Sequence, residues 1–404
     1  MGFIENDYFY IYSRMNLKIL KFFPNSNLSH TNMRDRLLFS LAFLMSLIIQ
    51  LNSQVPTDGI SWFDPREAPF QLSGFEWIIE EAMYRRLPVY PDWEIRDAVD
   101  QHANHTAGGQ IRFNSDCNRI LIKVELREKS GMYHMPATGQ SGFDLYVMED
   151  GEQRYFRTTR FNADSIRYQA ELFASDNKKM RTFTLNFPLY NGVNSVWIGL
   201  DQGSTVEAPP AFKQAGKVVV YGTSITQGGC VGRPGMAFTN ILSRLLDMQF
   251  VNLGFSGNGR GEPALAHLIT QISGTRCIIL DYEANAGLSI KETLGPFVDI
   301  LRDKHPDIPI LIMSKIRYAY NQEGSTSYKQ WMELRDFQRE LVDKRKGAGD
   351  KHIHFLDGST LLGEDYDECT VDGVHPNDLG SFRIADALRP AIESILSNNT
   401  VSPE

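Results

Sequence analysis

Cysteine is scarce in this sequence, and its four cysteines stand far apart. Cys117, Cys230, Cys277 and Cys369 include no CxxC pair and no spacing typical of metal ligands, so the sequence predicts no metal site. Cys230 and Cys369 are both expected in loops. A disulfide between these two residues is an alternative if the chain matures in an oxidising compartment.

Basic residues are fewer than acidic residues. The chain has 41 lysine and arginine residues against 49 aspartate and glutamate residues, and its formal net charge is −8. It has no basic stripe of the kind that binds polyanions, so nucleic acid is not an expected partner. Hydrophobic residues make up 42% of the 404 residues, which is typical of a globular protein of more than one domain.

No apolar run is long enough to cross a bilayer comfortably. The run at 37–49 (LLFSLAFLMSLII) has the length of a signal-peptide core and follows Arg34 and Arg36. We therefore expect an extension at 1–54 that carries a signal peptide starting at Met33, and a secreted or periplasmic protein without stable membrane insertion after cleavage. The alternative is a chain anchored in the membrane by this segment.

Residues 60–208 lack any long segment with helical periodicity. Short runs alternate between apolar and polar residues, as at 120–125, and turn residues separate them. Asp150-Gly151 lies between two such runs and predicts a tight hairpin, because glycine accepts the positive φ that such a turn requires. The pattern predicts an all-β domain, a sandwich or jelly roll, over 60–208.

Residues 215–397 show a different pattern, in which short apolar runs alternate with amphipathic stretches. A run that is apolar throughout is typical of a parallel strand buried on both faces. The alternation predicts a doubly wound parallel sheet, with a site at the carboxyl ends of its strands. The expected strands are 217–221, 250–253, 277–281, 308–313 and 353–356.

Two short motifs carry possible chemistry. Ser224 follows the first expected strand in the sequence YGTSIT, without the second glycine of a G-x-S-x-G elbow. Near the end of the chain, Asp372 precedes His375 by three residues. A carboxylate at this spacing can accept from one ring nitrogen and fix the tautomer, so that the other nitrogen takes a proton near neutral pH. Taken alone, each motif also fits an ordinary turn.

Two further loops follow the second and third expected strands. The first (NLGFSGNG) contains Gly257, and the second (DYEANA) contains Glu283 and Asn285. Backbone N–H groups at glycines and the side-chain amide of an asparagine can stabilise an oxyanion. Glycine and asparagine also favour plain turns. All these loops are expected at one edge of the sheet, which favours a shared site.

These segments, in this order, resemble the blocks of the SGNH (GDSL-like) hydrolase superfamily. Ser224 is similar to the nucleophile, although GTS stands where many members have GDS. Gly257 and Asn285 resemble the oxyanion residues, although EANA replaces the usual GxND, and Asp372 and His375 match the DxxH block. The resemblance implies a flavodoxin-like three-layer fold over 215–397. It also implies acyl-ester hydrolysis by a Ser-His-Asp triad, with an oxyanion hole of Ser224, Gly257 and Asn285, and neither a metal nor an organic cofactor.

The segment 142–146 reads GFDLY and resembles the GxDLY motif of β-domains that precede such hydrolase domains in bacterial esterases. The resemblance implies that Asp144 and Tyr146 support a hairpin or a domain interface. It also implies a small-molecule or polysaccharide ester substrate, most simply an O-acetylated carbohydrate. Arg233 and Glu283 are candidate substrate contacts. The alternatives are a lipase- or thioesterase-type acyl hydrolase and a non-catalytic carbohydrate-binding protein.

Overall fold

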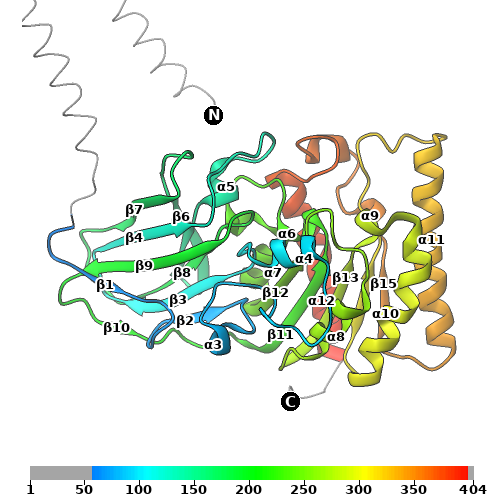
Figure 1. Cartoon of the computed structure of the whole chain (residues 1–404), viewed down its shortest axis with the longest axis horizontal. Helices are drawn as coiled ribbons and strands as arrows, with labels where there is room; N and C mark the ends of the chain where they lie inside the picture. Colours follow the sequence, from blue (N-terminus) through cyan, green and yellow to red (C-terminus); the bar gives the residue numbers. More distant parts are fainter. Residues whose placement is uncertain (1–56, 399–404) are drawn as a thin grey trace, which may run out of the picture. The chain divides into compact units, whose positions relative to one another are not determined.

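The computed structural model describes residues 57–398 (Figure 1). The expected signal segment at 37–49 and the start at Met33 lie outside the described residues and stay predictions. Within 57–398, no helix is both long and apolar enough to cross a membrane. We call residues 57–207 the β-region and residues 214–398 the α/β-region.

The β-region consists of two antiparallel sheets, as the alternating pattern predicts (Figure 1). The first has the order β1 (Ile60–Phe63), β9 (Val193–Asp201), β4 (Arg119–Leu126), β7 (Arg167–Ala174). The second has the order β10 (Val206–Glu207), β3 (Gln110–Ser115), β8 (Arg181–Asn186), β5 (Asp144–Glu149), β6 (Glu152–Thr158), and β2 (Gln71–Ser73) pairs with β3. Three short helices accompany them: α3 (Ile78–Glu81), α4 (Asp97–Ala103) and α5 (Ala137–Ser141).

The two antiparallel sheets enclose one apolar core. Ile120, Ile122 and Val124 of β4 pack in the same cluster as Phe113 of β3 and Phe183 of β8. Their side chains alternate along each strand because successive residues of a strand point to opposite faces. Two facing sheets with a shared core form a sandwich.

The Asp150-Gly151 hairpin forms as expected. Glu149 of β5 pairs with Glu152 of β6, so the loop between the strands consists of Asp150 and Gly151 alone. Asp150 has a φ of 51° and Gly151 a φ of 83°. A positive φ at both central residues is the turn that matches the right-handed twist of the flanking strands.

The α/β-region contains a parallel sheet of five strands, which confirms the predicted fold class. The sheet order is β12 (Met248–Gly254), β11 (Gln214–Gly222), β13 (Thr275–Asp281), β14 (Ile310–Met313), β15 (Ile353–Leu356). This is the flavodoxin-like order 2-1-3-4-5, in which the connections diverge on either side of the first strand.

Helices cover both faces of the parallel sheet and create two separate cores (Figure 1). Val219 faces the helices α8 (Pro263–Thr270), α10 (Ile290–Lys304) and α11 (Thr326–Gly347). Val218 and Val220 face α7 (Phe238–Leu246) and α12 (Asp378–Asn398) on the other side. Because β11 and β14 bury both of their faces, residues 218–221 and 310–313 are apolar without alternation.

The carboxyl ends of three strands meet at one level of the sheet. Gly222 of β11 is in register with Gly254 of β12 and with Asp281 of β13. The loops that follow these strands therefore begin side by side, at the point where the strand order reverses. In folds of this kind, ligands bind at this point.

Candidate active site

The serine singled out by the sequence directly follows the first parallel strand. Strand β11 ends at Gly222, and Ser224 is the first residue of the short helix α6 (Ser224–Gln227). A Cβ atom at Gly222 would lie 1.9 Å from Thr226 Oγ1, so only glycine fits this tight turn. The turn places Ser224 at the carboxyl edge of the sheet, where the residue is 7% exposed.

A continuous chain of hydrogen bonds joins Ser224 to His375 and Asp372. Ser224 Oγ lies 2.9 Å from His375 Nε2, and His375 Nδ1 lies 2.8 Å from Asp372 Oδ2. The second carboxylate oxygen, Oδ1, accepts from the backbone N–H groups of Val374 and His375. The loop can fold back in this way because Gly373 adopts a φ of 86°.

The ionisation of Asp372 sets the roles of the two ring nitrogens. Burial alone would raise the pKa of Asp372, but hydrogen bonds from the backbone and ring of His375 outweigh it and lower this pKa. Asp372 is therefore a carboxylate at neutral pH and can only accept. With His375 Nδ1 donating to it, Nε2 carries the lone pair that faces the Ser224 hydroxyl.

The loops that carry Gly257 and Asn285 are bonded to each other. Asn285 lies in α9 (Glu283–Ala286), and its Oδ1 accepts from Gly259 N–H at 3.2 Å. Because the carbonyl oxygen makes this bond, the amide nitrogen of Asn285 points elsewhere and keeps its N–H groups for another acceptor. Gly257 has a φ of 69°, and a Cβ at Gly259 would lie 2.2 Å from the Gly222 carbonyl oxygen.

A buried arginine of the β-region binds the end of strand β12, where the Gly257 loop begins. Arg86 is 1% exposed and donates to the carbonyl oxygens of Asn252 and Gly254 at the end of β12. It also donates to the carbonyl oxygens of His102 and His105. Burial lowers the pKa of Arg86 to about 9, so it remains a cation at neutral pH. Sequence reasoning missed this residue, because its two partners at the end of β12 lie more than 160 positions away along the chain.

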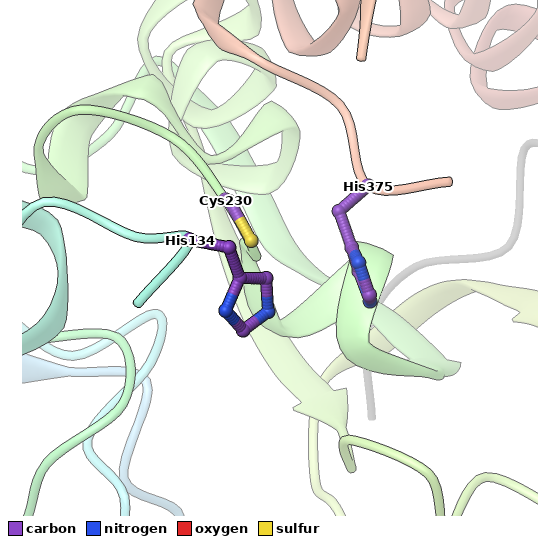
Figure 2. A group of neighbouring side chains, drawn as sticks. All are labelled: His134, Cys230 and His375. Carbon is purple, nitrogen blue, oxygen red and sulfur yellow. The ribbon is translucent and has the colours of Figure 1, made fainter. Parts of the chain in front are cut away.

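A second residue missed by the sequence analysis is His134, in the loop between β4 and α5 of the β-region. Its ring centre lies 5.5 Å from that of His375, at an interplanar angle of 61°. Figure 2 shows that His134, His375 and Cys230 lie close together. All four cysteines are buried and free, so the disulfide considered between Cys230 and Cys369 is not formed.

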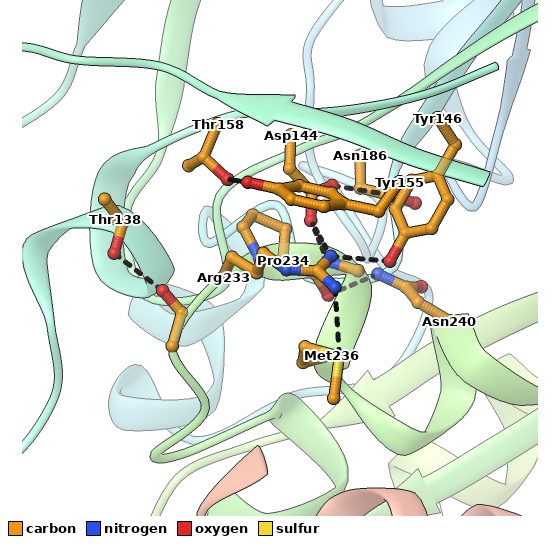
Figure 3. A network of polar contacts seen from close by, with 12 residues as sticks. Thr138, Asp144, Tyr146, Tyr155, Thr158, Asn186, Arg233, Pro234, Met236 and Asn240 are labelled. Atoms are coloured by element: carbon orange, nitrogen blue, oxygen red, sulfur yellow. Dashed lines mark hydrogen bonds and ion pairs between the residues drawn. The ribbon is translucent and has the colours of Figure 1, made fainter. Parts of the chain in front are cut away.

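The Arg233 side chain is engaged by residues of the β-region. Its guanidinium donates to Asp144 Oδ2 at 2.9 Å and to Tyr146 Oη, and it stacks over the ring of Tyr155 at 3.8 Å (Figure 3). Asp144 Oδ2 also accepts from Gly235 N–H. The aspartate and tyrosine of the GxDLY segment therefore hold the loop that follows Ser224. A substrate contact by Arg233 therefore stays a prediction.

Glu283 is also engaged inside the protein. It is 2% exposed, and its Oε2 accepts from Lys315 N–H at 2.7 Å and from Gln338 Nε2 at 2.8 Å. Burial raises the pKa of Glu283. The side chain thus ties the loop after β14 to helix α11, and the geometry gives no support to a substrate contact.

Comparison with known proteins follows the same division of the chain. The model of the GDSL-like lipase/acylhydrolase family matches residues 215–393. The model of the GxDLY family, described as the N-terminus of SGNH-hydrolase-type esterases, matches residues 60–206. No curated protein matches the chain.

Several solved structures share the fold. A putative GDSL-like lipase from Bacteroides ovatus is 28% identical, with a TM-score of 0.77 over 84% of this chain and 98% of that one. A salicylyl-acyltransferase from a tetracycline biosynthetic pathway is 18% identical, with a TM-score of 0.66 over the same shares. A family two carbohydrate esterase from Cellvibrio japonicus is 15% identical, with a TM-score of 0.54 over 84% and 98%.

Proposed function

Because the chain joins a GxDLY N-terminal domain to a domain of the GDSL-like lipase/acylhydrolase family, we propose that it is a serine esterase that uses Ser224, His375 and Asp372 as its triad. Similarity to the GDSL-like lipase/acylhydrolase family supports the hydrolysis of esters as the reaction. The hydrogen-bond chain from Ser224 Oγ through His375 to Asp372 is the observation that carries the assignment of the residues.

In the proposed acylation step, His375 Nε2 takes the proton of Ser224 Oγ as this oxygen attacks the ester carbonyl carbon. Asp372, a carboxylate held by two backbone N–H groups, stabilises the imidazolium that results. His375 then gives the proton to the departing alcohol oxygen. In the second half, His375 Nε2 takes a proton from water as the water attacks the acyl carbon. The proton then goes to Ser224 Oγ, and the carboxylic acid leaves.

The negative charge on the carbonyl oxygen needs donors that are fixed before the reaction begins. We assign this role to the backbone N–H groups of Ser224 and Gly257 and to the side-chain amide of Asn285. Two contacts support the assignment: the Asn285 amide oxygen is occupied by Gly259, and the Gly257 loop packs directly on the end of β11. Both contacts limit the reorganisation that the oxyanion would require.

We assign the substrate to acyl esters of carbohydrates, most simply O-acetyl groups, met outside the cytoplasm. The presence of a β-region that reaches the triad supports this assignment, as does the fold shared with a carbohydrate esterase. Two exposed rings lie near the triad: Tyr133, stacked on His134, and Tyr320, beside the Gly373 loop. Such flat apolar faces suit a sugar ring.

A serine-directed phosphonate tests the triad. It is expected to add once per chain on Ser224, as seen by mass spectrometry, and to leave Ser224→Ala unlabelled. Ser289→Ala, which changes an exposed serine outside the site, is the matched control and should label like the unchanged protein. Labelling of Ser224→Ala at the unchanged rate would refute the assignment.

Release of acetate from acetylated polysaccharides, compared with hydrolysis of acetyl, butyryl and longer acyl esters, tests the substrate class. We expect the rate to fall as the acyl chain lengthens and the polysaccharide to be deacetylated. A preference for long acyl chains would overturn the carbohydrate assignment and leave the triad assignment intact.

A further inference from the structure

Three potential metal ligands from three separate loops meet beside the triad. His134 comes from the β-region, Cys230 from the loop after α6, and His375 from the loop before α12. One ligand atom of each lies within 4.8 Å of the other two (Figure 2). Two imidazole nitrogens and one thiolate sulfur are a donor set that zinc and related divalent transition metals prefer.

We propose that His134, Cys230 and His375 form an inhibitory site for a divalent transition metal of the zinc type. The site itself follows from the geometry of the three side chains. Its consequence for activity rests on the proposed function, because His375 is there the general base. Metal binding and catalysis would then be mutually exclusive.

The spacing is close to what a bound metal requires. Zinc–nitrogen distances of about 2.0–2.1 Å and zinc–sulfur distances of about 2.3 Å place tetrahedral ligand atoms roughly 3.3–3.6 Å apart. The ligand atoms of His134, Cys230 and His375 lie within 4.8 Å of one another. Side-chain movements on the order of 1 Å therefore close the site, without rebuilding the loops.

His375 is already arranged as a metal ligand. Its Nδ1 is bonded to Asp372, so Nε2 is the nitrogen that can bind a metal. A histidine whose second nitrogen donates to a carboxylate is the usual support for a zinc-bound imidazole. The same Nε2 lone pair faces Ser224 Oγ at 2.9 Å, and it can serve only one partner at a time. A bound metal therefore removes the base from the serine.

Cys230 is fixed next to this histidine. Its backbone N–H donates to the carbonyl oxygen of Pro376, the residue that follows His375. Burial and the nearby Asp372 raise the pKa of the Cys230 thiol to about 12, so without a metal the thiol keeps its proton. A divalent metal displaces that proton to solvent. The charges of the metal, the thiolate and the Asp372 carboxylate then cancel, which suits a half-buried site.

Cobalt(II) tests binding without any need for activity. We expect one cobalt ion per chain, with the visible bands of a tetrahedral ion and a thiolate-to-cobalt charge-transfer band. Ser224→Ala should keep these bands, because it removes only the competing partner of Nε2. Cys230→Ser should lose the charge-transfer band, and Cys369→Ser, at another buried free cysteine, should not. Failure of the unchanged protein to give this band would overturn the site.

Inhibition of ester hydrolysis by zinc tests whether metal binding blocks His375 as the general base. Hydrolysis should fall as zinc is added and return when a chelator is added. In Cys230→Ser and His134→Ala, each measured against its own uninhibited rate, the inhibition constant should rise by at least about tenfold. Equal zinc sensitivity in both variants would overturn the proposal. Cobalt binding by a protein without esterase activity would refute the proposed function alone, so the two failures are distinguishable.

Discussion

The two sides of the candidate site are built in different ways. Ser224 is 7% exposed and begins the short helix α6 directly after the parallel strand β11. The side chains of His375 and Asp372 are 20% and 24% exposed, and the bonds that Asp372 accepts come from residues two or three positions away. Their loop also accepts one backbone bond from Ala319 and one from Cys230. We call these the strand side and the loop side. The strand side depends on tertiary packing, whereas the geometry between Asp372 and His375 on the loop side is set by local bonds.

This difference predicts that changes on the loop side affect catalysis more than stability. Asp372→Asn keeps the size of the side chain but cannot accept Nδ1–H and stabilise the imidazolium in the same way. We expect the turnover to fall by about 10⁴-fold, with a melting temperature within a few degrees of the unchanged protein. A large loss of melting temperature with near-normal turnover per folded molecule would show that the loop is structural.

Asn285→Ala tests the strand side with a smaller expected effect. Removal of one oxyanion donor typically lowers turnover by about 10²–10³-fold, so this variant should be impaired but measurable. KM for a small acetyl ester should change little, because the lost bond acts in the transition state. Unchanged turnover would remove Asn285 from the site.

Gly259→Ala tests whether the strand side depends on close backbone packing. The added Cβ would lie 2.2 Å from the Gly222 carbonyl oxygen, so the loop and the strand end must separate. We expect a loss of about 1–3 kcal/mol in the free energy of unfolding together with a loss of turnover. Gly295→Ala, at a helical position with open space around it, is the control and should not destabilise the protein.

A last prediction concerns the pH dependence of stability and Asp281, which accepts from Thr226 Oγ1 next to the nucleophile turn. Burial raises the pKa of Asp281 from 3.8 to about 7. Between these values the folded state binds a proton that the unfolded state has lost, so this group makes stability fall as pH rises from about 4 to about 7. Asp281→Asn should flatten the pH dependence of urea unfolding in that window. An unchanged slope would contradict the shift.

Much of the fold could be predicted from the sequence because its signals are short-range. Alternation at 120–125 marks a strand with one buried face, and the continuous apolar run at 217–221 marks a strand buried on both faces. The Asp150-Gly151 turn follows from the φ values that only such residues accept readily. The contact between Asp372 and His375 is equally local, whereas the catalytic roles of these residues stay predictions.

The sequence by itself thus determined the five parallel strands, the end of each to within one residue, and that polar residues follow those ends. Only the tertiary structure decided that Arg233 binds Asp144, 89 positions away, and that Glu283 binds Lys315 and Gln338. It also brought His134 and Cys230 to His375, although their spacing shows no ligand pattern. The physical reason is one of range: backbone geometry and side-chain alternation act over a few residues, whereas these partners meet only after two regions of the chain have packed together.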